Sequence, residues 1–177
     1  MCSIIGYYGK EFAAPIIVKG LKRMEYRGYD SVGVATESNN EIKLKKGIGK
    51  VNEVNSKIQL DSLPGKIGIG HTRWATHGKV TEFNAHPHPS NSGKIAIVHN
   101  GIIENFEELK KQLENEGYDF KSETDSEIIA NLLQKHYEET GDVKETILKQ
   151  FRRLKAIMHM LQCLKMVSWL LQDFMSH

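Results

Sequence analysis

The residues best suited to chemistry are a cysteine at position 2 and three polar segments that follow apolar runs. A thiol becomes a nucleophile when a base activates it, and a lone cysteine of an intracellular chain is a candidate for that role. Cys2 is also compatible with a small hydrophobe heading the strand expected at residues 4–9. An acylated lipoprotein cysteine would instead need a basic, apolar leader before it. We interpret the other cysteine, Cys163, as incidental.

The segment HTRWATHG contains groups that suit a small anion. The guanidinium of Arg73 can bind a carboxylate through two hydrogen bonds, and Trp74 beside it can exclude water. Thr76 and His77 follow in the same segment, so a loop built from these residues could close over a ligand. Taken alone, the segment could also be an exposed arginine beside a core tryptophan, and this is the more common arrangement.

Two further segments carry an amide and a carboxylate. In HNG, the side-chain amide of Asn100 and the N–H of Gly101 follow a strand-like run, which suits an oxyanion hole at the end of a strand. An ordinary Asn-Gly turn has the same sequence. In SETDSE, Asp125 lies at an expected helix start, where it could bind a substrate ammonium or simply favour the helix N-terminus.

Several histidines close together in the sequence raise the question of a metal site; they are His71, His77, His86, His88 and His99. Their spacings match neither the helical H-x-x-x-H pair nor a C-x-x-C zinc site. We therefore expect no metal to be bound.

Charge and composition exclude several classes of partner. The 24 basic and 22 acidic residues are dispersed, without the basic stripe that favours nucleic-acid binding. No apolar run approaches the roughly 18 residues that indicate a membrane span. Two cysteines do not make a disulfide framework. The sequence therefore predicts a cytoplasmic protein that binds neither nucleic acid nor membranes.

Strands and helices are mixed along the chain but do not alternate strictly, which favours an α+β fold over a doubly wound parallel sheet. A first helix is predicted within residues 11–26, where Phe12 and Ile16 belong to a set of apolar residues at helical spacing. The pair Asn39 and Asn40 lies between two β-rich runs and predicts a tight hairpin turn.

Three more helices are expected in the second half of the chain. The segment ENFEELKKQLENEG is amphipathic and ends at Gly117, a C-terminal stop. Thr124 followed by Glu127 predicts a capping box at the start of the next helix. Asp142 and Glu145 frame the start of the last one.

The segments together resemble one family closely. MCSIIGYYG, LKRMEYRGYDSVG, HTRWATHG, NAHPH, VHNGIIEN and SETDSE are similar to the glutaminase domain of the hexosamine-forming class II amidotransferases, which use an N-terminal nucleophile. The resemblance runs in order from Met1 to about Leu154. It implies the fold of N-terminal-nucleophile hydrolases, a four-layer α/β/β/α sandwich, here incomplete at the C-terminus, and it implies no cofactor.

The resemblance also implies residue roles. Removal of Met1 exposes Cys2, whose own α-amine then acts as general base for its thiol. The remaining residues implied for catalysis are Asn100 and Gly101 at the oxyanion and Arg27, which orients the N-terminal residue. The residues implied for glutamine binding are Arg73 for the α-carboxylate, Asp125 for the α-ammonium, and Trp74, Thr76 and His77 in a closing loop. Ser3 departs from the glycine usual after the cysteine, and we expect slower catalysis at worst.

The resemblance stops at about Ala156. One permitted set of codons for residues 156–177, when read one base out of register, encodes a strand and a turn like those that the family has at this point. We therefore expect a partial glutaminase domain at residues 1–155 and a frame-shifted tail at 156–177, without domain character and folded as helix or coil. A genuine divergent helix is the alternative.

The intact family enzyme passes ammonia from glutamine to fructose 6-phosphate, giving glucosamine 6-phosphate, through an isomerase half that this chain lacks. That half is also where a dimer is expected to form. One alternative is a class II amidotransferase with another acceptor, such as phosphoribosyl pyrophosphate or the substrate of asparagine synthetase. Another is an inactive fragment or binding module.

Overall fold

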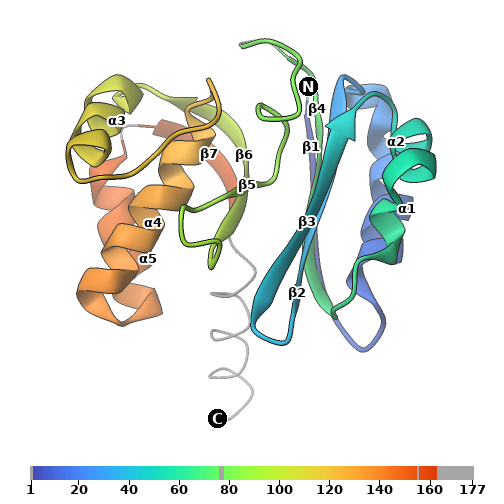
Figure 1. Ribbon diagram of the computed structural model, residues 1–177, viewed down its shortest axis with the longest axis horizontal. Helices are drawn as coiled ribbons and strands as arrows, with labels where there is room; N and C mark the ends of the chain where they lie inside the picture. Colours follow the sequence, from blue (N-terminus) through green and yellow to red (C-terminus); the bar gives the residue numbers. More distant parts are fainter. Residues whose placement is uncertain (1, 76–77, 155, 163–177) are drawn as a thin grey trace.

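Two β-sheets face each other in the middle of the molecule, and helices cover the outer face of each (Figure 1). The computed structural model describes residues 2–75, 78–154 and 156–162. Within these residues every strand pairing is antiparallel. The predicted α+β class is therefore confirmed.

The first half of the chain builds one sheet, with the strand order β1-β4-β2-β3. Its strands are β1 (Ser3–Tyr8), β2 (Ser31–Ser38), β3 (Glu41–Ile48) and β4 (Ile67–Arg73). Its helical segments are α1 (Ala13–Met24), η1 (Glu25–Arg27), α2 (Val51–Ile58) and η2 (Leu60–Ser62). Asn39 and Asn40 both have positive φ between β2 and β3, which confirms the predicted hairpin turn.

The first predicted helix is present as α1, but its buried face does not include all the apolar residues that were grouped by helical spacing. Ile17 and Leu21 are fully buried against the sheet. Phe12 precedes the helix and is 62% exposed, and Ile16 is 38% exposed. The two buried alanines at the helix start complete this face instead, and their small side chains let the helix approach the sheet closely.

Glycines on one face of β4 make that approach possible. Gly68 and Gly70 lie under α1, and a Cβ on Gly70 would stand 3.0 Å from Leu21 Cδ1. Because successive strand residues point to opposite faces, Ile69 and His71 point toward the second sheet. Ile69 packs there in the layer between the sheets. The sequence of β4 thus assigns one face to a helix and the other to the interior of the molecule.

The second half has the strand order β5-β6-β7. Its strands are β5 (His88–Pro89), β6 (Ala96–Ile103) and β7 (Ala156–Gln162). Its helices are α3 (Phe106–Asn115), α4 (Ser126–Thr140) and α5 (Val143–Arg153). Gly117 follows α3 with a φ of 91°, and the Asp142 side chain accepts a hydrogen bond from Glu145 N, so the predicted stop and start are confirmed.

Alternation along β6 again separates two faces. Ile97 and Ile103 pack against α3 and α4, whereas Ala96 and Val98 pack against the first sheet. Asn100 continues the second series and therefore also points toward the first sheet. The prediction that HNG ends its strand is wrong, because β6 continues to Ile103.

The predicted capping box at α4 is also wrong. Glu127 accepts hydrogen bonds from Lys121 N and Ser122 N, in the segment that enters the helix, instead of pairing with Thr124. Asp125 is the N-cap residue, but its Oδ2 accepts from Ile103 N of β6 at 2.8 Å. Both carboxylates satisfy backbone N–H groups outside the helix, so they tie its start to neighbouring segments.

The tail differs from the helix or coil expected for residues 156–177. Residues 156–162 form β7, which pairs antiparallel with β6 from Ile103↔Ala156 to Ile97↔Gln162. Backbone N–H and C=O groups on a free strand edge pair with any extended segment, whatever its side chains. Residues 163–177 lie outside the described residues. The shifted reading frame stays a prediction, which sequencing the gene across codon 155 tests.

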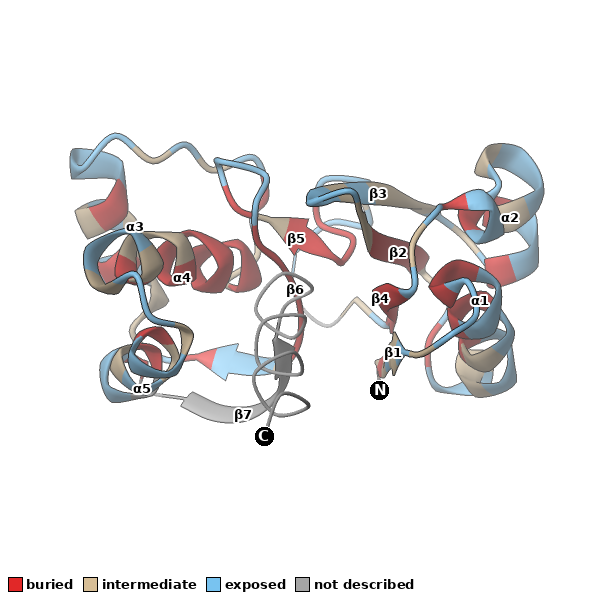
Figure 2. Cartoon of the chain, turned by 90° about the horizontal axis from the view of Figure 1, so that it is seen from below, coloured by how far each residue is buried: buried red, intermediate tan, exposed pale blue. Residues whose placement is uncertain are grey.

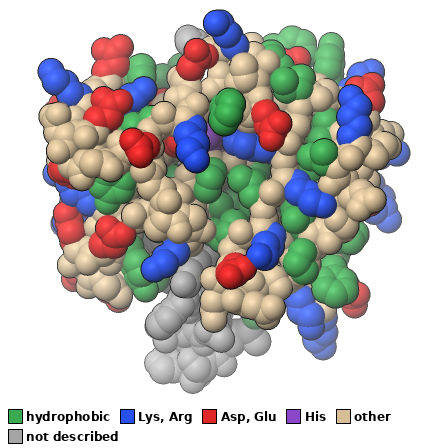
Figure 3. All heavy atoms as spheres, viewed as in Figure 1, with side chains coloured by type: hydrophobic (Ala, Val, Ile, Leu, Met, Phe, Trp, Pro, Cys, Tyr) green, Lys and Arg blue, Asp and Glu red, His purple; other side chains and the backbone are tan. Residues whose placement is uncertain are grey.

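Burial follows the layers, as Figure 2 shows. Separate apolar clusters lie beneath α1, beneath α3–α5 and between the two sheets. Charged side chains of both signs are interspersed over the face in Figure 3. None of the helices in the described residues is long and apolar enough to cross a bilayer.

The segment that precedes β5 lies directly on the first sheet. Lys46 of β3 donates to Ala85 O at 2.6 Å and to Pro87 O at 3.3 Å. A Cβ on Gly33 of β2 would collide with the carbonyl oxygen of His86. Lys46 and the missing side chain at Gly33 together fix this segment, which carries His86.

We expect Gly33→Ala to lower the free energy of unfolding by about 1–3 kcal/mol, because backbone atoms must move to relieve the collision. Gly20→Ala is the matched control. Its Cβ would meet only the flexible end of Ile5, and alanine favours a helix. Urea denaturation of both variants measures the difference, and equal effects at the two positions would contradict this account.

Candidate active site

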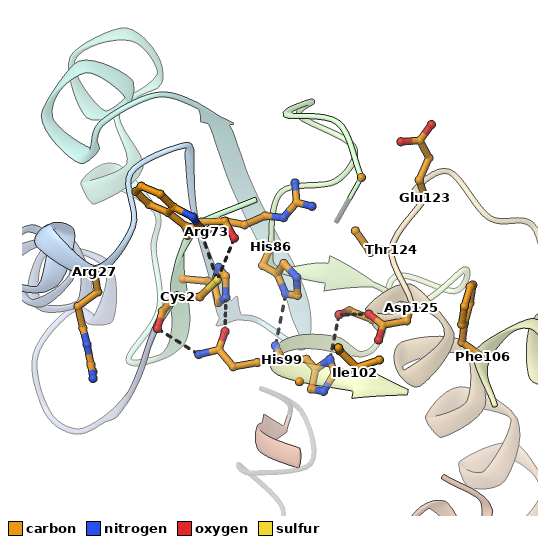
Figure 4. A pocket seen from close by; sticks show the side chains of 16 residues that line it. Cys2, Arg27, Arg73, His86, His99, Ile102, Phe106, Glu123, Thr124 and Asp125 are labelled. Atoms are coloured by element: carbon orange, nitrogen blue, oxygen red, sulfur yellow. Dashed lines mark hydrogen bonds between the residues drawn. The ribbon is translucent and has the colours of Figure 1, made fainter. Parts of the chain in front are cut away.

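A pocket of about 790 Å³ opens between the sheets, at the end where β1 begins and β4 ends (Figure 4). Most of the predicted site residues line it: Cys2, Arg27, Arg73, Trp74, Asn100, Gly101 and Asp125. Thr76 and His77, which were also predicted, lie outside the described residues. The fold thus brings together groups that are far apart in the sequence and that come from both halves.

The pairing of β1 with β4 determines the position of Cys2. Ser3 is opposite Thr72, so continuing this register places Cys2 opposite Arg73, the last residue of β4. Cys2 Sγ accepts a hydrogen bond from Trp74 N at 3.2 Å and lies 3.6 Å from Trp74 O. The thiol is therefore held at the mouth of the gap between the sheets.

Asn100 reaches Cys2 from the opposite sheet. Its Nδ2 donates to Cys2 O at 3.3 Å, and its Oδ1 lies 2.9 Å from His71 Nε2. Gly101 follows it in β6 and also lines the pocket. A side-chain amide N–H and a backbone N–H beside a thiol can stabilise negative charge on an oxygen bound next to the sulfur.

Opposite charges lie on the two sides of the pocket. Arg73, at the end of β4, is 6% exposed, and its Nη1 donates to Lys79 O at 3.2 Å. Burial lowers the pKa of Arg73, while the nearby groups of Cys2 and Asp30 act to raise it. Asp125, at the start of α4, accepts from Ser126 Oγ at 3.2 Å. A ligand with a carboxylate and an ammonium would fit between these two charges.

Trp74 and Arg27 lie at the rim. Trp74 is 43% exposed, and its ring meets Tyr29 edge-on at a centroid distance of 5.5 Å. The predicted role of Trp74 in excluding water thus concerns the pocket mouth and not its floor. Arg27 projects from η1, and Figure 4 shows its guanidinium to one side of Cys2.

Asn84 and Asp30 were missed by the sequence analysis. Asn84 is 1% exposed; its Nδ2 donates to Lys79 O at 2.9 Å, and its Oδ1 accepts from Glu123 N at 2.9 Å. It therefore joins the segment after Arg73 to the segment before Asp125. Asp30 Oδ2 accepts from Ala75 N at 2.8 Å and so supports the same loop. Both lie in segments quoted for the resemblance, Asp30 in LKRMEYRGYDSVG and Asn84 in NAHPH, but neither was assigned a role.

The histidines pack against one another and against hydroxyl and amide groups. His71 and His86 stack at 4.3 Å, and His88 meets His86 edge-on at 4.5 Å. His99 Nδ1 lies 3.0 Å from Ser126 Oγ. Burial lowers the pKa of His71 to about 4 and the pKa values of His86 and His88 well below their ordinary range. Burial therefore favours the neutral form of the His71, His86 and His88 rings.

Among the described residues, no group of three or more His, Cys, Asp or Glu side chains is arranged to hold a metal ion.

The sequence profile of the glutamine amidotransferase domain family matches residues 58–153. The chain therefore belongs to this family and is a glutamine amidotransferase domain. Within the family, its sequence matches that domain of glutamine–fructose-6-phosphate aminotransferases.

Two relatives illustrate the match. The chain is 52% identical over 155 residues to glutamine–fructose-6-phosphate aminotransferase (isomerizing) of Pyrococcus horikoshii, covering 88% of this chain and 26% of the relative. It is 56% identical over 151 residues to the enzyme of the same name from Methanococcus maripaludis, covering 85% of this chain and 24% of the relative. The chain spans about a quarter of the length of these curated relatives.

Solved structures support the fold. Glutamine phosphoribosylpyrophosphate amidotransferase from B. subtilis superposes with a TM-score of 0.77 at 30% identity, covering 92% of this chain and 35% of that one. The allosteric regulatory enzyme of purine biosynthesis gives the same TM-score at 32% identity, covering 90% of this chain and 34% of that one. The fold is therefore that of class II amidotransferase domains.

We expect Asn84→Ala to lower the free energy of unfolding by about 1–3 kcal/mol, because Lys79 O and Glu123 N lose a buried partner. Asn52→Ala, at an exposed position of α2, is the control and should change it by less than about 0.5 kcal/mol. Chemical denaturation measures both variants. Indistinguishable effects would mean that Asn84 does not join the two segments.

Proposed function

We propose that this chain hydrolyses the side-chain amide of glutamine, with Cys2 as the nucleophile. The observation that carries the proposal is the convergence of the Cys2 thiol, the Asn100 amide and the opposite charges of Arg73 and Asp125 on one pocket. Family membership supplies glutamine as the substrate.

Catalysis requires that removal of Met1 leaves Cys2 with a free α-amine. The ordinary pKa of an α-amine lies close to neutral pH, which suits a general base. The Cys2 sulfur then bonds to the carbonyl carbon of the glutamine side chain, while the thiol proton passes to the amine. The histidines need not act as the base.

The attack converts the carbonyl oxygen into an oxyanion, which accepts hydrogen bonds from Asn100 Nδ2 and Gly101 N. Collapse of this intermediate breaks the C–N bond, and the proton on the α-amine goes to the leaving nitrogen. Ammonia and a thioester result. Water then attacks the thioester, releasing glutamate and restoring the thiol.

The same pocket would hold the other end of glutamine. Arg73 binds the α-carboxylate and Asp125 the α-ammonium, as charge-assisted hydrogen bonds favour. The roles of Trp74, Thr76 and His77 in a loop that closes over the substrate stay a prediction, as does the role of Arg27 in orienting the N-terminal residue. Ser3 is small and nearly fully buried, so it is compatible with this arrangement.

We further propose that the layers are the four-layer sandwich of N-terminal-nucleophile hydrolases, and that fructose 6-phosphate is the ultimate acceptor of the ammonia. The acceptor is supported by the names of the relatives that are 52% and 56% identical to the chain. A phosphoribosyl pyrophosphate acceptor is the second candidate, supported by the solved structure at 30% identity.

Cys2→Ala should abolish glutamine hydrolysis, because Cys2 carries the only thiol among the described residues that line the pocket. Ammonia release from glutamine measures the effect, and Cys163→Ala is the control for loss of a thiol. Mass spectrometry of the parent should find the N-terminus at Cys2. Retention of Met1, or ammonia release by Cys2→Ala within about tenfold of the parent, would refute the assignment.

Arg73→Ala and Asp125→Ala should each raise KM for glutamine by roughly tenfold to a hundredfold, since each removes a charge-assisted contact of about 1.5–3 kcal/mol. Arg23→Ala, at an exposed position of α1, is the control. An unchanged KM in both pocket variants would mean that the two charges do not hold the substrate.

A further inference from the structure

The hydrogen bond between His71 and Asn100 has no part in the mechanism above. We infer that His71 is a positioning residue, which holds the Asn100 side-chain amide with its nitrogen toward Cys2 and its oxygen away. The inference rests on the proposed function, because the orientation matters only if Asn100 stabilises an oxyanion.

The two ends of the Asn100 amide face different partners. On one side is Cys2 O, a backbone carbonyl that only accepts hydrogen bonds, so Asn100 must present its Nδ2 there. Its Oδ1 therefore faces His71 Nε2, at 2.9 Å. Because Oδ1 only accepts, His71 Nε2 must carry the proton. The Cys2 carbonyl thus fixes the amide orientation, and the amide fixes the tautomer of the imidazole.

The surroundings of His71 hold the ring in place. His71 is 1% exposed, lies on the inner face of β4 and stacks on His86. Desolvation disfavours the imidazolium, so the ring is neutral and offers one N–H, the one at Nε2. Asn100 lies within β6, where its backbone is paired with β7. Donor and acceptor are therefore carried by two strands and not by loops.

The orientation has a direct chemical consequence. An amide rotated by 180° about its last bond would point Oδ1 at the developing oxyanion, where two partial negative charges repel each other. With His71 donating to Oδ1, the amide is polarised and its N–H groups become better donors, since linked hydrogen bonds reinforce one another. His71 would therefore act on the rate of the chemical step and not on glutamine binding.

Kinetics of three variants of the full chain test this role. Glutamine places its Nε2 at nearly the same distance from Cα as histidine, so His71→Gln keeps a donor. His71→Leu removes the donor and puts an apolar side chain of similar volume in its place. His136→Leu is the matched control, because His136 is also a fully buried histidine but belongs to α4, outside the pocket lining.

We expect His71→Leu to lower kcat for glutamine hydrolysis by about tenfold to a hundredfold, less than the loss of the oxyanion donor itself. KM should stay within about threefold, and His71→Gln should recover most of kcat. An unchanged kcat in His71→Leu would overturn the inference. So would equal losses in the leucine and glutamine variants, because a role in packing alone would not distinguish a donor from a non-donor.

A second measurement does not depend on activity. Long-range ¹H–¹⁵N spectra of the parent chain at pH 7 should show one imidazole in the neutral Nε2–H form that is absent from the His71→Gln spectrum. An Nδ1–H tautomer or a charged ring at His71 would overturn the inference even in a chain that releases ammonia. A chain with the expected tautomer but no ammonia release would instead contradict the proposed function.

Discussion

The close face-to-face packing of two antiparallel sheets is the constraint on which the site depends. Strand alternation gives β4 and β6 one face each for the layer between the sheets, and the same alternation that buries Ile69 and Val98 brings His71 opposite Asn100. A shift of one residue in either strand would turn these polar side chains toward the helices. The apolar contacts between the sheets and the polar contacts of the site therefore have a common origin.

The layer between the sheets changes character along its length. One end is filled by Ala35, Ala96 and Ile67, and the end at the pocket contains His71 and His86. Buried imidazoles supply N–H and lone-pair groups without carrying a charge, so they satisfy polar partners at little electrostatic cost. A neutral, close-packed floor beneath Cys2 allows the charges of Arg73 and Asp125, on the two sides of the pocket, to dominate the field on a ligand.

Patterns with a local cause were predictable from the sequence. The helices α1 and α3 and the hairpin at Asn39–Asn40 follow from spacing and turn chemistry, and the α+β class follows from the order of strands and helices. The roles of Glu127 and Asp125 were not predictable, because each bonds backbone groups of another segment. Asn84 was missed for the same reason. The strand at 156–162 depends on the free edge of β6, which the local sequence does not reveal.

The division of the chain has a consequence for how the molecule folds. Among the described residues, 3–73 supply the first sheet and 88–162 supply the second, so each layer is built from one continuous stretch. The contacts between the layers are not the longest in sequence, because His71 and Asn100 are 29 residues apart, whereas Ser3 pairs with Thr72 inside the first sheet. Docking of the layers therefore closes no longer a loop than formation of the first sheet does. The pocket is lined by residues of both stretches, so its ability to bind a ligand reports that both sheets have formed and docked.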